Sequence, residues 1–378
     1  MMALIIDEIE AWACTLPLSQ PLDFGAFQIV DRKHTVVRVR TADGLVAECI
    51  GQSRGAPIDV ALLDVIAPLC LGQSALDYEA IRRRVVPAMN ALELEGTIGR
   101  AWSLMDICLH DLRAQAAGWP LWRLLGGDPE PVTAKMVEGY ALVGESNQAF
   151  AGRLVERVEQ GYRILKVEAA HYSRHEEILE RLRFYQSALS TPAKLVLDFA
   201  WTWRDVKSQL SLLQALETLP IGWIEDPFAR TNVQAYRELR DATGHAVGCG
   251  DEATRPADLI RLINERAVDV LRLDATTIGG IEAARRICHQ ARTAGLRVSF
   301  HEHPEIHEHL VFGLDSADHV EIFPLDRPFD RVHDLWQSTI FDRIDAGRLH
   351  PPTTPGTGIR LITDAVEHYA VRHGRVSS

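Results

Sequence analysis

The 378-residue sequence lacks several features that would place it in other protein classes. No apolar run reaches the roughly 18 residues needed to cross a membrane. The first ten residues, MMALIIDEIE, have no basic stretch and soon turn acidic, so we expect no signal peptide. The six cysteines are scattered without a Cys-x-x-Cys pair, so we expect buried thiols in a cytoplasmic protein rather than a disulfide framework.

Basic residues are also fewer than acidic ones. Lys and Arg number 40 against 52 Asp and Glu, which gives a formal net charge of -12. Because nucleic-acid phosphates attract basic surfaces, this balance argues against nucleic-acid binding. Hydrophobic residues (47%) and charged residues (24%) are typical of a soluble globular protein, and the length allows one large domain plus a smaller one.

Residues 1–130 predict a mixed α+β domain. Residues 34–49 contain two strand-like runs around an Asp-Gly turn, which is the signal of a β-hairpin. Residues 97–127 predict helix, interrupted by a Gly and a Pro and ended by two consecutive glycines. The loop-rich residues 330–378 are expected to return and pack on this domain.

Residues 131–329 have a different rhythm, in which short apolar runs alternate with amphipathic helical stretches. Eight βα-type repeats in about 190 residues predict a closed parallel barrel rather than an open doubly wound sheet. A dinucleotide-binding sheet would need Gly-x-Gly-x-x-Gly after its first strand, and none is present. The predicted strands lie at 135–142, 162–168, 193–199, 222–227, 246–252, 268–274, 296–302 and 318–324.

Ionisable residues recur at the C-terminal ends of these runs. Their successive spacings are 32, 27, 26, 23, 27 and 20 residues, each about one βα unit. Because the C-terminal ends of barrel strands ring one mouth, we expect these side chains to converge there. The alternative is that single Asp or Glu residues cap the next helix. The seven residues are Lys166, Asp198, Glu225, Asp251, Asp274, His301 and Glu321.

Three carboxylates from successive strands, Asp198, Glu225 and Asp251, predict a metal site with only oxygen ligands. Hard oxygen ligands favour Mg²⁺ over Zn²⁺. Without a cation these carboxylates would repel one another, so a bound ion is expected. Glu252 is the alternative third ligand, because strand alternation lets only one of the two neighbours face the site.

The stretch 301–310, HEHPEIHEHL, is rich in metal-binding residue types but contains no His-Glu-x-x-His motif. Only His301 is in phase with the preceding strand, and an imidazole can titrate near neutral pH, so His301 is the predicted general base. Asp274, one strand earlier, is predicted to hold the other ring nitrogen and fix the tautomer. His303, just beyond the strand end, is predicted to contact substrate.

Together these segments resemble the enolase superfamily, and within it the mandelate racemase/muconate lactonizing enzyme family. The segments that carry the resemblance are DICLHDLRAQAAGWPLWRLLGG, LDF, WIEDP, GDE, DATTIGGI, SFHEHPEIHEHL and DHVEIF. The resemblance implies an α/β fold: a modified (β/α)₇β TIM barrel with an N-terminal α+β capping domain. It also implies one Mg²⁺, a small-molecule carboxylate substrate, removal of the proton α to that carboxylate, and an even-numbered homo-oligomer.

The resemblance also implies roles for two further residues. Lys166 would act as an acid/base or as an electrophile that polarises the carboxylate, unless it only forms a salt bridge to a metal ligand. Glu321 would hydrogen-bond the developing enediolate, provided that it is protonated. In place of the family's usual Lys-x-Lys, Glu168 stands where the second lysine would be; it could bind substrate, and burial or a neighbouring anion would raise its pKa. Ala200 stands where the subgroup often has Asn.

A dyad of His301 and Asp274 could take the α-proton and then protonate a leaving hydroxyl. We therefore expect dehydration of a sugar acid, an aldonate or aldarate, to a 2-keto-3-deoxy acid. The alternative is racemisation or epimerisation of a 2-hydroxy or amino acid, with Lys166 or Glu168 as the second base. An alternative of another class is a barrel that binds metal and ligand without turnover. Specificity is expected in capping-domain loops, where Arg54 could meet a distal carboxylate or hydroxyl.

Overall fold

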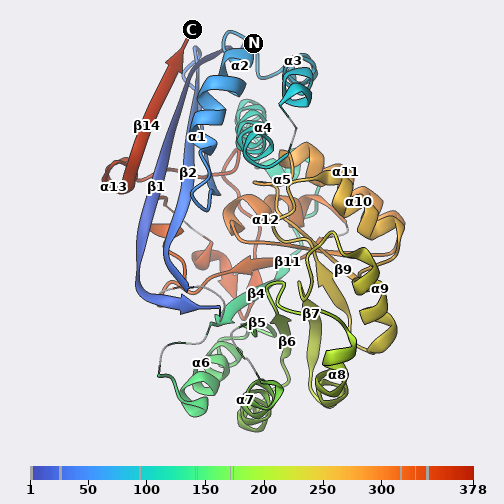
Figure 1. Cartoon of the computed structure of the whole chain (residues 1–378). Coiled ribbons are helices and arrows are strands. Elements are labelled where there is room, and N and C mark those ends of the chain that lie inside the picture. Colours follow the sequence, from blue (N-terminus) through green and yellow to red (C-terminus); the bar gives the residue numbers. More distant parts are fainter. Residues whose placement is uncertain are drawn as a thin grey trace.

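Two β-sheets organise the chain, and Figure 1 shows them as a long ribbon at the left and a barrel at the lower right. One sheet has four strands; the other contains an eight-stranded barrel extended by two short strands. The computed structural model describes residues 3–24, 28–92, 95–140, 142, 144–170, 172, 174–315, 317–327, 329–337 and 340–378.

The four-stranded sheet is antiparallel throughout, in the order β14-β1-β2-β3. The pairing of β2 with β3 confirms the hairpin predicted for residues 34–49. β14 comes from the far end of the chain and pairs with β1. The strands are β1 (Ile6–Asp23), β2 (Gln28–Thr41), β3 (Val46–Gln52) and β14 (Ala370–Ser377).

Helices cover one side of this sheet, as Figure 1 shows. The predicted helical region 97–127 is confirmed as two helices, α4 and α5, separated around Gly118 and Pro120. No described helix combines the length and apolar character required to cross a lipid bilayer. The helices are α1 (Ile58–Ala61), the π-helical η1 (Leu62–Ile66), α2 (Ala67–Cys70), α3 (Tyr78–Ala91), α4 (Thr97–Ala116) and α5 (Leu121–Leu124).

Eight parallel strands form a closed barrel, because β11 pairs with β4. One α-helix follows each of the first seven, which confirms the predicted (β/α)₇β TIM-barrel fold with an α+β capping domain. The strands are β4 (Val132–Gly139), β5 (Ile164–Glu168), β6 (Lys194–Asp198), β7 (Ile221–Glu225), β8 (Val247–Cys249), β9 (Val270–Leu273), β10 (Arg297–Phe300) and β11 (Ala317–Ile322).

Strand alternation explains why charged side chains point into this barrel. In β5, Leu165 and Val167 are fully buried and belong to the large apolar cluster, while Lys166 and Glu168 face the interior cavity.

The outer helices are α6 (Asn147–Glu159), α7 (His175–Ala188), α8 (Leu210–Leu216) with the short 3₁₀ turn η2 (Lys207–Gln209), α9 (Val233–Ala242), α10 (Pro256–Asn264), α11 (Gly280–Thr293) and α12 (Pro304–Gly313).

The chain after residue 330 contacts both sheets. β13 pairs with β4 of the barrel, whereas β14 joins the four-stranded sheet. The domain boundaries at 130/131 and 329/330 remain predictions. The elements of this region, apart from β14, are η3 (Val332–Asp334), η4 (Phe341–Arg343), β12 (Ile344–Asp345), β13 (Arg348–Leu349) and α13 (Thr363–Tyr369).

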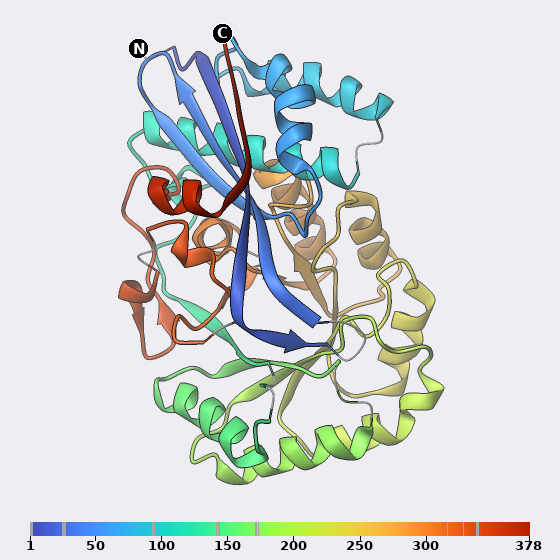
Figure 2. The ribbon, with the colours of Figure 1, turned by 60° about the vertical axis from the view of Figure 1, so that its left-hand side comes forward.

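The β1–β2 ribbon reaches from the capping helices down to the barrel, as Figure 2 shows. At its lower end, Leu22 and Phe24 form a small apolar cluster with barrel-side residues Tyr140, Phe323 and Phe329. Burying these side chains removes apolar surface from water, at roughly 25 cal/mol per Å². The cluster therefore holds the capping sheet against the barrel next to the strand ends.

A second connection joins the capping helix α4 to the barrel helix α11. Asp106 Oδ1 accepts the backbone N–H of Ile281 at 2.7 Å, and Asp106 Oδ2 accepts the hydroxyl of Tyr78 at 2.5 Å. Gly280 has φ +85°, and a Cβ added there would overlap the carboxylate of Asp106. Only glycine fits at this contact.

We predict that Gly280→Ala destabilises the protein. A left-handed backbone costs a residue with a side chain about 1–2 kcal/mol, and the overlap with Asp106 adds to this. The matched control is Gly152→Ala in α6, where an added Cβ meets nothing within 4 Å. The thermal unfolding midpoint of this variant should equal or exceed that of the wild type. The thermal unfolding midpoints test this, and equal midpoints for the two variants would contradict the assigned contact.

Candidate active site

The three carboxylates predicted as metal ligands meet at the barrel mouth. Asp198 and Glu225 are the last residues of β6 and β7, and Asp251 follows β8. One oxygen from each lies within 4.8 Å of the others, and this is the only such group of His, Cys, Asp and Glu in the described part of the chain. Glu225 Oε1 and Asp251 Oδ1 are buried, and each lies 2.6 Å from a cationic nitrogen, of Lys166 and Arg272 respectively. This all-oxygen donor set fits Mg²⁺.

Glu252, the alternative third ligand, faces away from this group. Arg54 Nε lies 2.7 and 2.8 Å from its two carboxylate oxygens, and Arg100 is a second partner at 3.5 Å. Asp251 reaches the other ligands because Gly250, with φ +127°, turns the chain where a Cβ would overlap the backbone of Arg272. The geometry therefore selects Asp251.

Lys166 occupies the centre of the carboxylate group. Its Nζ lies 2.9 Å from Asp198, 2.6 Å from Glu225 and 3.3 Å from Asp251. Burial alone would lower the pKa of Lys166, but the attraction of these carboxylates outweighs it and raises the pKa well above its ordinary value. The sequence left two roles open for Lys166: an acid/base or electrophile, or a salt bridge to a metal ligand. These distances match the salt bridge.

Two further cations, neither of them predicted from the sequence, lie inside the barrel. Arg272 is fully buried, with Nε 3.0 Å from Glu225 and 2.6 Å from Asp251. Lys135, also fully buried, lies 2.6 Å from Glu321. Strand alternation was the signal that could have found Arg272, because it precedes Asp274 by two residues on the same face of its strand.

The predicted role of Glu321 was conditional on its being protonated, and its neighbours favour the ionised form. Its Oε2 lies 2.6 Å from Lys135 and 2.7 Å from Arg272, and its Oε1 accepts the backbone N–H of Glu302. Burial would raise the pKa of Glu321, but these cations outweigh it and hold the pKa well below its usual range. Glu321 is therefore an ionised carboxylate beneath the cavity, and it is not among the described residues that line it.

His301 and Asp274 form the predicted dyad. His301 Nδ1 lies 3.2 Å from Asp274 Oδ2, while its Nε2 points toward Asp251, at 3.7 Å. The backbone N–H and the hydroxyl of Thr276 both donate to Asp274 Oδ1 at 2.7 Å, which fixes the carboxylate. Burial would lower the pKa of His301, but Asp251, Glu302 and Asp274 raise it to about 10. A cation bound at Asp251 would offset the attraction of that carboxylate and so lower the pKa of His301.

Glu168 lies in the cavity beside a metal ligand, since β5 pairs Glu168 with Asp198 of β6. It is buried, and its Oε1 accepts the backbone N–H of Ala170 at 2.8 Å. Burial, and then repulsion by Asp198, raises the pKa of Glu168 well above its ordinary value, while Lys166 opposes this only in part. The departure from the family's second lysine therefore leaves a carboxyl group that holds a proton readily.

These side chains surround a cavity of about 50 Å³. Capping-sheet residues close it on one side, and Trp201 lines it, whereas Trp203 instead packs between Phe199 and Phe228. The described lining residues are Phe24, Ile29, Arg32, Arg54, Tyr140, Lys166, Glu168, Asp198, Ala200, Trp201, Asp226, Asp251, Glu252, His301 and Glu302.

That His303 contacts substrate stays a prediction, and the structure places its ring toward the capping sheet. His303 is buried outside the cavity lining, and its Nε2 accepts the backbone N–H of Gln52 in β3 at 3.2 Å. Its ring lies edge-on to that of His34, 6.1 Å away. A left-handed backbone, with φ +41°, turns the side chain toward the capping sheet. Burial lowers the pKa of His303 to about 3, so this residue joins the two sheets as a neutral ring.

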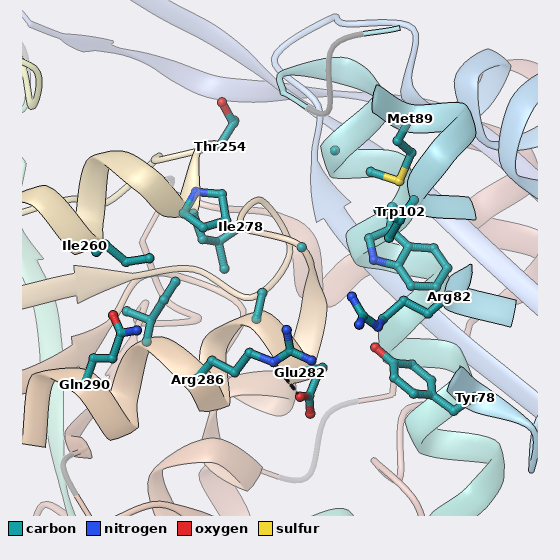
Figure 3. A pocket seen from close by; sticks show the side chains of 16 residues that line it. Tyr78, Arg82, Met89, Trp102, Thr254, Ile260, Ile278, Glu282, Arg286 and Gln290 are labelled. Carbon is teal, nitrogen blue, oxygen red and sulfur yellow. Dashed lines mark hydrogen bonds and ion pairs between the residues drawn. The ribbon is translucent and has the colours of Figure 1, made fainter. Parts of the chain in front are cut away.

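A larger cavity of about 310 Å³ lies between α3 and α4 of the capping part and α10 and α11 of the barrel (Figure 3). Its described lining is mainly apolar, with Met89, Trp102 and Ile278, and Arg286 pairs there with Glu282 at 2.7 Å. It contains none of the predicted site residues. The chemistry therefore belongs to the smaller cavity.

Comparison with known families agrees with this arrangement. Residues 149–365 match the family described as "Enolase C-terminal domain-like", and residues 9–126 match the "Mandelate racemase / muconate lactonizing enzyme, N-terminal domain". The chain belongs to the mandelate racemase/muconate lactonizing enzyme family of the enolase superfamily. The resemblance inferred from the sequence motifs is thereby confirmed.

Individual relatives carry out different reactions. An L-talarate/galactarate dehydratase from Salmonella typhimurium is 26% identical over 277 residues, which is 73% of this chain and 69% of the relative. An L-Lys-D/L-Arg epimerase from Methylococcus capsulatus is 25% identical over 366 residues, 94% and 98% of the two chains. The structure of L-talarate dehydratase from Polaromonas sp. JS666, complexed with Mg and L-glucarate, has a TM-score of 0.88 at 23% identity and 99% coverage of both chains. These identities support the superfamily and the fold without selecting one reaction.

We predict that Asp251→Asn removes most of the stabilisation by Mg²⁺, whereas Glu252→Gln keeps it. Binding at 100 times Kd would stabilise the folded wild type by about 2.7 kcal/mol. Thermal unfolding with and without MgCl₂ measures this for each protein. Loss of the Mg²⁺ effect in the Glu252 variant, with retention in the Asp251 variant, would reverse the ligand assignment.

Proposed function

We propose that the protein removes the proton α to a carboxylate with the help of Mg²⁺, and then eliminates the β-hydroxyl of a sugar acid. The substrate class is an aldonate or aldarate, and the product is a 2-keto-3-deoxy acid. The observation that carries this proposal is the buried dyad of His301 and Asp274, whose histidine lies 3.7 Å from Asp251 of the carboxylate triad and lines the same cavity. A dehydratase is also found among the relatives.

Asp198, Glu225 and Asp251 are the residues that would hold the ion. When bound, Mg²⁺ supplies positive charge where the substrate carboxylate gains negative charge, which favours the transition state over the ground state. The chain's own cation, Lys166, lies beside the same oxygens and lines the cavity, so it adds positive charge at this position.

His301 performs both proton transfers in this proposal. Neutral Nε2 takes the α-proton, while Asp274 accepts the Nδ1–H and stabilises the resulting imidazolium. The imidazolium then donates the same proton to the departing β-hydroxyl, which leaves as water. The C–O bond breaks as the electron pair from the α-carbon forms the carbon–carbon double bond. Tautomerisation of this enol gives the 2-keto acid.

Epimerisation is the second candidate, and Glu168 is the observation that favours it. A racemase or epimerase needs a proton donor on each face of the α-carbon. Glu168 lines the same cavity and has a raised pKa, so it could return a proton to the face opposite His301. An epimerase is also found among the relatives.

A binding protein without turnover is a poorer fit to the site. A barrel that only held metal and ligand would have no need for a histidine oriented by a carboxylate that Thr276 fixes in turn. We further propose that the protein acts in the cytoplasm on a small-molecule carboxylate, as a homo-oligomer, without nucleic-acid or membrane partners.

We predict that His301→Asn lowers turnover by about 10²–10⁴-fold, because general base catalysis is lost. The protein is incubated with Mg²⁺ and a panel of acid sugars in D₂O. A 2-keto product supports dehydration, and deuterium at an inverted α-carbon supports epimerisation. His289→Asn, an exposed position on α11, should leave both readouts unchanged. Normal turnover in the His301 variant would exclude this mechanism.

We predict that Glu168→Gln separates the two reactions. Glutamine keeps the size of the side chain and can still accept the N–H of Ala170, but its amide does not act as an acid or base near neutral pH. For a dehydratase, turnover should fall by at most about tenfold, the value of one hydrogen bond. For an epimerase, inversion should stop while His301 still exchanges the α-proton on one face. NMR of the α-carbon in D₂O distinguishes these outcomes.

A further inference from the structure

Arg32 of β2 is a buried cation that faces the candidate active site. Its side chain comes from the capping sheet, lines the cavity and is 3% exposed. Nε and one terminal nitrogen donate to a single carbonyl, that of Phe329, at 3.0 and 2.8 Å. No hydrogen bond from the other terminal nitrogen is found within the described chain. The guanidinium is thus held in place by a neutral group, with donor capacity left over.

The other cations that line the cavity are each paired with a carboxylate. Lys166 pairs with four carboxylates, Arg54 forms a two-oxygen pair with Glu252, and His301 pairs with Asp274. Over the ranges that the structure describes, Arg32 has no carboxylate within ion-pair distance. Burial disfavours its charged form, but Tyr140, Glu302 and Asp330 favour it and outweigh both burial and Arg54, so the pKa of Arg32 is raised.

Such a cation is costly without an anion. Removing a guanidinium from water carries a penalty of several kcal/mol, which is offset here by a neutral carbonyl and by Glu302 and Asp330 without a direct ion pair among the described residues. Arginine also presents its donors in a planar fork that matches the two oxygens of a carboxylate. A carboxylate arriving with the substrate supplies the missing charge, so the penalty is relieved when substrate binds.

The cavity therefore has two cationic attachment points that differ in origin. One is the carboxylate triad with Lys166 on the barrel side, where the reacting carboxylate is placed by the proposed function. The other is Arg32 on the capping side, next to Tyr140, whose phenol also lines the cavity. A substrate with one carboxylate satisfies only the first of them.

We propose that Arg32 binds a second carboxylate of the substrate, so that the protein acts on dicarboxylates of the aldarate type rather than on aldonates. This inference rests on the proposed function for the position of the first carboxylate. Arg32 is then a binding residue that selects the substrate at the end opposite to the chemistry.

The test uses matched pairs of acid sugars that differ only in whether the far carbon is a carboxylate. We choose glucarate with gluconate, galactarate with galactonate, and xylarate with xylonate, each with Mg²⁺ present. Ligand-induced shifts of the thermal midpoint, dissociation constants, and kcat/KM where turnover occurs are compared within each pair. The wild type should prefer the dicarboxylate in at least one pair.

Arg32→Met should reduce that preference by about ten- to a hundredfold, the value of a hydrogen-bonded charge, because the loss of affinity is larger for the dicarboxylate than for the monocarboxylate. Arg32→Lys keeps the charge but loses the fork, so it should retain part of the preference. Arg38→Met is the control: Arg38 lies six residues along the same strand and pairs with Glu48 at 2.7 Å. That variant should lower the thermal midpoint without changing the preference.

Two results would overturn the inference. One is a wild type that binds the members of every pair equally, or binds none of them. The other is an equal loss for both members of a pair in the Arg32 variants. The proposed function fails separately: Arg32-dependent binding of a dicarboxylate without any α-proton exchange in D₂O would refute the reaction and leave the binding site standing. Exchange of the α-proton of monocarboxylates, without any preference for dicarboxylates, would refute the role of Arg32 and leave the proposed reaction standing.

Discussion

The structure depends on holding several carboxylates of like charge inside a closed barrel, where water does little to screen their repulsion. The carboxylates are stable there because cationic side chains from other strands lie between them. Each of the three cations contacts at least one carboxylate at 2.6 Å. Strand alternation produces this arrangement, since the residues that place charge inside alternate with aliphatic residues that pack outward. The interleaved groups are Asp198, Glu225, Asp251 and Glu321 with Lys135, Lys166 and Arg272.

The cavity above this charge cluster is closed by a different kind of surface. The capping side contributes Phe24 and Ile29 together with Arg32 and Arg54, while the barrel contributes the carboxylates, Lys166 and His301. Exclusion of water strengthens the electrostatic interactions that act on a bound carboxylate. This difference between the two walls of the cavity follows from the topology. The strand ends form only the barrel wall, so the opposite wall comes from another part of the chain.

Much of the site could be predicted from the sequence, because one spacing rule covers it. Residues one βα unit apart at strand ends must meet in a parallel barrel, and this located the metal ligands and the dyad. The rule fails for groups that are not at the strand ends: Arg272 lies two residues earlier. It also fails for His303, where a left-handed turn sends the ring toward β3. The ionisation of Glu321 depends on neighbours from β4 and β9, which no local pattern reveals.

The carboxylate of Asp106 connects two parts of the chain that the barrel's own repeats do not connect. It belongs to the capping helix α4, yet it receives the first backbone N–H groups of the barrel helix α11. Those groups cannot find partners inside their own helix. A barrel excised from this chain would therefore carry an uncapped helix, at a cost of about 0.5–2 kcal/mol.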